Sequence, residues 1–203
     1  MFSSTKIIEL GSCAFRQPQA TSHCRFLHGY RLTAKFWFEA EALDKNNWVV
    51  DFGGLKELKK LFQEQFDHTT CISRNDPKLE VFKKLNEAGV CDLRIMDGVG
   101  IEKFAEFCHD TAQQFVDKLT DSRCRCVKVE VFEHENNSAI FERRHSVVSG
   151  AAYMNDKATE IEEAFNKNDA NLTKPPFADK IPAAVGNKKQ TNKWTDSDST
   201  WGI

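Results

Sequence analysis

The sequence lacks several features that mark particular classes of protein. Its apolar runs fall well short of the ~20 residues that a membrane-spanning helix needs, and its first residues lack the apolar core of a secretory signal peptide. It also lacks a basic excess, because 28 Lys and Arg stand against 30 Asp and Glu, for a net charge of -2. We therefore expect a cytoplasmic protein with no nucleic acid partner and no membrane partner.

A disulfide framework is absent as well. Seven cysteines is an odd number, and their scattered positions indicate reduced thiols. Cys124 and Cys126 are separated by one residue, so a strand would direct both to the same face. We interpret this pair as packing residues.

Periodicity predicts an α+β domain. The strongest signal is strict alternation of apolar and polar residues in 31–42, which is typical of a half-buried antiparallel strand. Shorter extended segments are expected at 7–15, 48–52, 93–96, 127–132 and 139–142, and helices at 55–66, after Asp76-Pro77 as far as Gly89, and at 101–119. This order favours helices on one face of an antiparallel sheet.

The pattern ends near Arg144. Residues 145–203 show no alternating strand and contain three of the five prolines, and 187–203 is almost wholly polar apart from Trp194 and Trp201. This part of the chain offers little apolar surface to offset the entropy of ordering. We expect one domain over 1–144 and a polar, largely flexible C-terminal tail over 145–203.

Four places in the sequence carry residue types that suit chemistry: Cys24, the pair Asp67-His68, Glu133 and His28. Cys24 lies between His23 and Arg25, and cationic neighbours lower the pKa of a thiol, although a small buried residue is the alternative. Asp67 and His68 place a carboxylate beside an imidazole, or else form a helix cap beside a surface histidine. The sequence leaves the functional and the structural interpretation open for Cys24 and for the pair Asp67-His68.

Glu133 and His28 are the other two positions. Glu133 continues the apolar face of Val127, Val129 and Val131, where an unpaired charge is costly unless something binds it. His28 precedes Gly29 at the start of a strand, and a single histidine is a weak metal signal because a zinc site needs three or four ligands.

These pieces form a joint pattern over residues 5–144. They are 24–30 (CRFLHGY), 50–56 (VDFGGLK), Asp67-His68, Glu102, and Glu133 followed by 138–141 (SAIF). The pattern resembles the 6-pyruvoyl-tetrahydropterin synthase family, and most of all its bacterial 6-carboxytetrahydropterin synthase branch. The resemblance implies the tunnelling fold (T-fold), a four-stranded antiparallel sheet with two main helices on one face, which assembles into an oligomeric barrel with sites at subunit interfaces.

The resemblance also implies roles for individual residues. Cys24 matches the catalytic thiol, and Asp67 with His68 matches the proton-transfer pair. Glu133 matches the carboxylate that anchors the pterin ring, and Glu102 a second acidic residue of the substrate pocket.

The zinc site departs from the family pattern. His28 matches one of three zinc-binding histidines, but Phe15 and Tyr30 occupy the positions of the other two. The residues left as substitutes are His23, Cys13 and His134.

Two functions follow from this resemblance. The first is a lyase that converts 7,8-dihydroneopterin triphosphate to 6-carboxy-5,6,7,8-tetrahydropterin in 7-deazapurine (queuosine) biosynthesis. The alternative is a non-catalytic protein of the same fold that binds a pterin or purine, or serves as an oligomeric scaffold, and has lost the zinc site.

Overall fold

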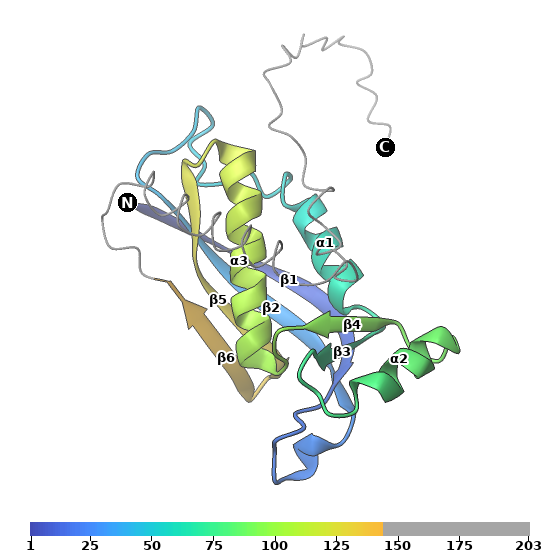
Figure 1. Cartoon of the computed structure of the whole chain (residues 1–203). Coiled ribbons are helices and arrows are strands. Elements are labelled where there is room, and N and C mark those ends of the chain that lie inside the picture. The colour runs from blue at the N-terminus through green and yellow to red at the C-terminus, as the bar shows by residue number, and fades with distance from the viewer. Residues whose placement is uncertain (144–203) are drawn as a thin grey trace, which may run out of the picture.

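The computed structural model describes residues 1–143, and the predicted tail over 145–203 lies outside this range (Figure 1). Six strands, three α-helices and one 3-10 helix follow the order β1 (Phe2–Phe15), η1 (His23–Arg25), β2 (His28–Ala40), α1 (Lys56–Phe66), β3 (Thr69–Ser73), α2 (Leu79–Glu87), β4 (Leu93–Met96), α3 (Ile101–Thr120), β5 (Cys124–His134) and β6 (Asn137–Glu142). The fold is α+β, as predicted.

The sheet is larger than the predicted four antiparallel strands. Its order is β4-β3-β1-β2-β5-β6, in which the last four strands are antiparallel neighbours. The prediction gave 93–96, observed as β4, as an extended segment, but it missed β3 and the parallel pairing of these two strands, with α2 as their crossover. β3 contacts β1 only where Cys13–Phe15 pairs with Thr69–Cys71, so the sheet is mixed at this edge.

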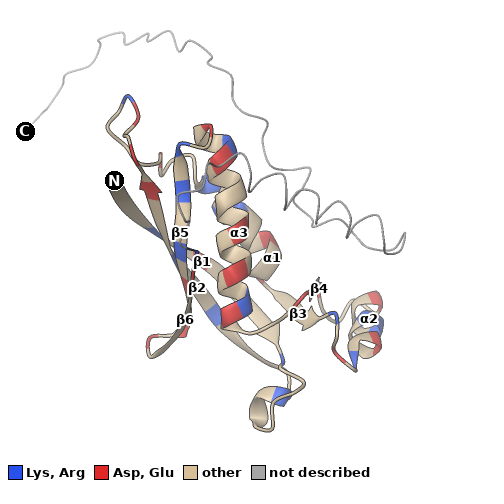
Figure 2. Cartoon of the chain, turned by 60° about the vertical axis from the view of Figure 1, so that its left-hand side comes forward, with Lys and Arg blue, Asp and Glu red and all other residues tan. Residues whose placement is uncertain are grey.

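Helices α1 and α3 cover one face of the sheet, as Figure 2 shows from the side. The alternation predicted for β2 directs its apolar residues to this covered face, where aromatic side chains fill the core. The fully buried phenylalanines are Phe15, Phe36, Phe38, Phe62, Phe66 and Phe104. Burial of this kind, at about 25 cal/mol per Å² of apolar surface, is the main force that holds the helices on the sheet.

Two β-bulges decide where site residues lie. The pairing of β1 with β2 shifts between Glu9 and Gly11, and Gly11 has a φ of +108°, a conformation that favours glycine. The pairing of β5 with β6 shifts between Phe132 and His134, which leaves Glu133 as the extra residue. A bulge of this kind redirects a side chain away from the regular alternation.

The thiols of Cys124 and Cys126 are packing groups in this fold. Both are buried on the helix-covered face of β5. Burial raises the pKa of Cys124 to about 11 and raises the pKa of Cys126 as well, so both thiols stay protonated at neutral pH.

None of the helices within residues 1–143 combines the length and the apolar character that crossing a bilayer requires.

Candidate functional site

A polar pocket of about 450 Å³ lies where the start of α3, the β5–β6 hairpin and the loop after β1 meet. Its lining residues are Gln17, Ile101, Glu102, Glu133, Asn136, Asn137 and Ser138. The bulge places Glu133 in this pocket, and Glu102 enters from the first turn of α3. The structure therefore brings together the two acidic residues that the resemblance assigns to substrate binding.

Gln17 is a lining residue that the sequence did not reveal. It follows β1 and is half-buried, and no motif or spacing distinguished it from the neighbouring polar residues of the loop. Only the return of this loop toward the start of α3 makes it part of the pocket.

Cys24 lies in the short 3-10 helix η1, in the same loop that carries Gln17 (Figure 1). The hydroxyl of Ser22 caps this turn by accepting from the backbone N–H of Cys24, at 3.4 Å. The carbonyl of Cys24 accepts from the N–H of Gln17 at 2.9 Å. The thiol is half-buried, so the alternative of a fully buried packing residue does not hold.

Asp67 and His68 form a contacting pair just after α1. Oδ1 of Asp67 accepts from the N–H of Ser12 at 3.1 Å and lies 3.0 Å from Nδ1 of His68. The Ser12 N–H is the largest cause of the lowered pKa of the Asp67 carboxyl, and His68 adds to it, so Asp67 stays ionised at neutral pH. Asp67 is also the C-cap residue of α1, so both interpretations of this pair describe part of its structure.

His68 is held in an unusual conformation beside the outer edge of β1. Its φ is +58°, and its N–H donates to the carbonyl of Ser12 at 2.8 Å. The side chain is 87% exposed. Among residues 1–143, no hydrogen bond or ion pair joins Asp67 or His68 to Cys24 or Glu133. The polar pocket is lined by Glu102 and Glu133 and not by Cys24, Asp67 or His68.

The position of the expected zinc site contains an aromatic cluster. Phe15 pairs with His28 across β1 and β2, with ring centroids 4.8 Å apart. The ring centroid of Tyr30 lies 5.7 Å from that of His28 and 6.4 Å from that of His134. Nδ1 of His28 lies 2.7 Å from the carbonyl oxygen of Phe26, which can only accept, so this nitrogen carries a proton.

The residues around His28 do not fit a zinc ion. A zinc site needs at least three converging ligands, and the described part of the chain contains no group of three or more His, Cys, Asp or Glu that could hold a metal. Cys13 is buried, and its Sγ contacts the carbonyl of Ala14 at 3.6 Å. Cys13 lies opposite Tyr30 in the pairing of β1 with β2, whereas Phe15 lies opposite His28. A hydrogen bond with the thiol of Cys71 is the largest cause of the lowered pKa of Cys13.

Comparison with known sequences gives a family. The sequence model of the family described as 6-pyruvoyl tetrahydropterin synthase matches residues 9–144. A protein of Rickettsia conorii named 6-carboxy-5,6,7,8-tetrahydropterin synthase is 34% identical over 80 residues, 39% of this chain and 57% of that protein. Its namesake in Rickettsia felis is 37% identical over 57 residues, 28% of this chain and 41% of that protein. The chain thus spans about half the length of these curated relatives.

Comparison with solved structures supports the fold. An uncharacterized protein from Wolinella succinogenes superposes with a TM-score of 0.61 at 15% identity, covering 70% of this chain and 98% of that one. A 6-pyruvoyltetrahydropterin synthase from Plasmodium vivax gives a TM-score of 0.52 at 16% identity, covering 71% of this chain and all of that one. At these identities the likeness concerns the fold alone.

Proposed function

Because the chain belongs to the 6-pyruvoyl tetrahydropterin synthase family, we propose that it is a lyase of the 6-carboxytetrahydropterin synthase type. Its substrate is 7,8-dihydroneopterin triphosphate, and its product is 6-carboxy-5,6,7,8-tetrahydropterin for 7-deazapurine (queuosine) biosynthesis. The names of the curated relatives support this choice within the family. The observation that carries it is the polar pocket that Glu133 and Glu102 line together.

Glu133 anchors the pterin ring in this proposal. The amino group and the adjacent ring N–H of a pterin are two donors in one plane, and a carboxylate accepts both at once. A ligand that covers the half-buried carboxylate of Glu133 must supply such donors, because a carboxylate removed from water without them is costly.

Cys24, Asp67 and His68 move protons on the substrate side chain. The ionised Asp67 lies 3.0 Å from Nδ1 of His68 and orients its ring, so His68 can exchange one proton with the substrate while the Cys24 thiol exchanges another. One water is consumed, two carbons leave the side chain as acetaldehyde, and triphosphate leaves. No step is assigned to zinc, because the residues around His28 do not fit the metal.

Assembly of several copies completes the site. Within the described residues, β3 covers the outer edge of β1 only at Cys13–Phe15, so the edge from Phe2 to Glu9 is unpaired, and β6 forms the other edge of the sheet. Such edges pair with further strands. In a ring of copies, joining β1 to the β6 of a neighbour brings His68 of one copy to the Glu133 pocket of the next, because both lie at the same end of the sheet.

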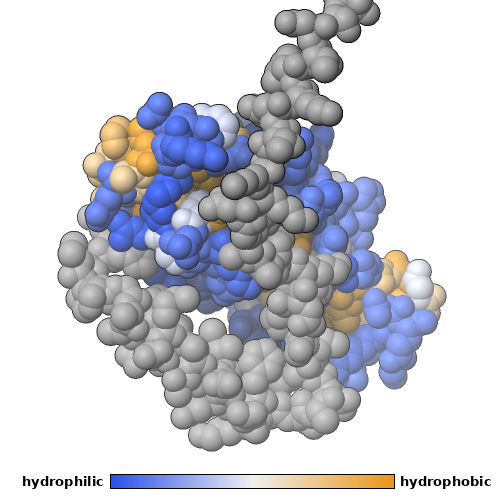
Figure 3. Space-filling model, turned by 90° about the horizontal axis from the view of Figure 1, so that it is seen from above, coloured by the Kyte–Doolittle hydropathy of each residue, from blue (hydrophilic) through white to orange (hydrophobic). Residues whose placement is uncertain are grey.

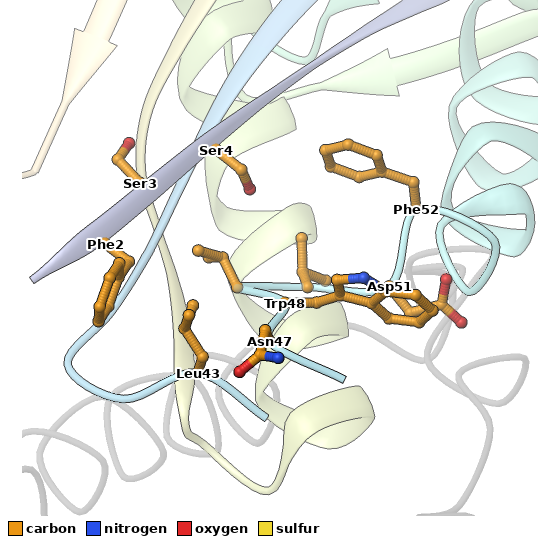
Figure 4. Close-up of a pocket in the computed structure, with 10 residues that line it drawn as sticks. Phe2, Ser3, Ser4, Leu43, Asn47, Trp48, Asp51 and Phe52 are labelled. Carbon is orange, nitrogen blue, oxygen red and sulfur yellow. The ribbon is translucent and has the colours of Figure 1, made fainter. Parts of the chain in front are cut away.

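An apolar pocket beside the unpaired edge of β1 supports this assembly. It measures about 540 Å³, and its largest lining residues are Phe2, Trp48 and Phe52, each 44–49% exposed (Figure 4). Figure 3 looks down on this end of the molecule and shows apolar surface among hydrophilic residues. Apolar surface of this kind is typical of a contact with another protein chain.

Loss of the zinc ligands favours the second candidate function, a pterin-binding or scaffold protein without turnover. Phe15 and Tyr30 fill the metal position with rings that pack on His28. The cytoplasm is the proposed compartment in either case, since all seven cysteines are free thiols.

Turnover separates the two candidates. Purified protein is incubated with 7,8-dihydroneopterin triphosphate, and acetaldehyde and the 6-carboxy product are measured. Formation of both supports the lyase. Binding of pterin without product supports the non-catalytic alternative, and absence of both product and binding contradicts the proposed pterin site.

A further inference from the structure

Gln17 lies in the loop that carries Cys24, and two hydrogen bonds within that loop hold its main chain. Its backbone N–H donates to the carbonyl of Cys24 at 2.9 Å, and its own carbonyl accepts from Ala20 at 3.0 Å. These bonds fix the main chain of Gln17 at the base of the loop. Its side chain is therefore positioned by the same backbone that positions the thiol.

The side chain of Gln17 extends over the start of α3. A methyl group built on Gly100 would lie 2.6 Å from Nε2 of Gln17 and 3.3 Å from Oε2 of Glu102. The amide and the carboxylate thus approach the same spot, and the absence of a side chain at Gly100 leaves room for both. Gly100 also has a φ of +107°, so glycine suits this position on two grounds.

The pocket needs a hydrogen-bond donor, and Gln17 is the half-buried residue that offers one. Glu102 and Glu133 accept only when ionised. The hydroxyl of Ser138 already donates to Glu130 at 2.7 Å, and Asn136 and Asn137 are exposed at the hairpin. A pterin that donates to Glu133 also carries a ring carbonyl beside those donors, and this oxygen requires a donor from the protein.

We propose that Gln17 is a specificity-determining residue of this pocket, whose amide donates to the oxygen of a 2-amino-4-oxo heterocycle held by Glu133. This assignment rests on the proposed function, because it takes a pterin as the ligand. It adds a residue from the loop of Cys24 to the two carboxylates. Recognition of the ring and placement of the thiol then depend on one loop.

The test compares Gln17→Ala and Gln17→Glu with wild-type protein by calorimetric titration of neopterin. Loss of one neutral hydrogen bond predicts a Kd that is roughly 3- to 10-fold higher for Gln17→Ala. The Glu variant should bind more weakly still, since it replaces the donor with a third carboxylate. Gln19→Ala is the matched control, because Gln19 is an exposed amide in the same loop, and it should bind as wild type does.

Alkylation of Cys24 by iodoacetamide distinguishes recognition from disturbance of the loop. The rate should be the same in Gln17→Ala and wild-type protein. Three results would overturn the assignment alone. They are a changed rate of Cys24 alkylation, an unchanged Kd for Gln17→Ala, and a loss of neopterin affinity in Gln19→Ala equal to that in Gln17→Ala. Wild-type protein that binds no neopterin overturns both the assignment and the proposed pterin function.

Discussion

The two pockets at opposite ends of the sheet differ in their chemistry. The pocket near the end of β1 contains the carboxylates of Glu102 and Glu133 and the amide of Gln17. The pocket near the start of β1 has walls of Phe2, Trp48 and other apolar residues. The proposed function assigns a small ligand to the first pocket, because its carboxylates suit the donors of a pterin, and a neighbouring copy to the second, because exposed apolar side chains are typical of such contacts. We call these the chemical end and the assembly end of the molecule.

The largest expected effect concerns proton transfer at the chemical end. Cys24→Ala and His68→Ala should each lower kcat by ~10²- to 10⁴-fold, because each removes a group that exchanges a proton with the substrate. Release of acetaldehyde from 7,8-dihydroneopterin triphosphate measures the loss. Circular dichroism should show an unchanged fold, since both side chains lie outside the core.

Cys91→Ala is the control for the thiol. Cys91 is a half-buried cysteine near α2, away from both pockets, and its loss should leave turnover unchanged. Near-normal kcat in either the Cys24 or the His68 variant would contradict the mechanism and weaken the distinction between the two ends.

The next effect concerns ligand choice. Glu133→Gln keeps the size of the side chain but turns one acceptor into a donor, which opposes the donors of a pterin. Binding of neopterin or sepiapterin should weaken by roughly 2 to 4 kcal/mol, the range for losing a charge-assisted pair and leaving mismatched groups enclosed. Calorimetric titration measures it.

Glu135→Gln serves as the matched control. Glu135 is an exposed carboxylate in the same hairpin and does not line the polar pocket. Equal affinities of wild type and Glu133→Gln would remove the pterin pocket and reduce the family membership to a statement about fold.

A smaller effect is expected at the assembly end. Trp48→Asp places a charge in the apolar pocket and should weaken association between copies by roughly 10- to 100-fold, the range for a buried aromatic anchor. Sedimentation velocity measures the shift toward smaller species. The same dissociation should lower turnover, because His68 of one copy then no longer lies beside the Glu133 pocket of its neighbour.

Val81→Asp tests whether any charge on apolar surface has this effect. Val81 is 52% exposed on α2, away from the unpaired edge of β1, and its replacement should leave the mass unchanged. An unchanged mass for Trp48→Asp would show that the apolar pocket is no subunit contact.

The smallest expected effect is the response to metal. Treatment with a chelator should change Tm by less than ~1 °C, because an ion that does not bind the native state cannot stabilise it. Phe15→His combined with Tyr30→His restores the family ligands and should make Tm depend on added zinc. Stoichiometric zinc in wild-type protein purified without a histidine tag would contradict the aromatic interpretation of this position.

Local patterns were sufficient for the elements with strong periodicity. The alternation at 31–42 predicted β2, observed as His28–Ala40, and helical spacing at 101–119 predicted α3, observed as Ile101–Thr120. Both elements are half-buried, so the contrast between their faces is present in the sequence.

Two segments were predicted wrongly because their faces show no such contrast. The first four residues of β3 (Thr69–Ser73) are all buried, so the strand does not alternate. Residues 48–52 are irregular, with bends at Val49 and Val50, in place of the predicted strand. Oδ1 of Asp44 accepts from the N–H groups of Asn46 and Trp48 at 2.8 and 2.9 Å, which closes the chain into a turn.

The amino-acid sequence by itself determined the family, the α+β class and the candidate residues, because these depend on residue types and their order along the chain. Only the tertiary structure decided that Glu102 and Glu133 share a pocket and that Gln17 joins them. It also placed His68 at an outer edge, away from that pocket in one chain. The physical reason is that bulges, loop returns and sheet edges arise from contacts between distant segments, which leave no periodic trace in the sequence.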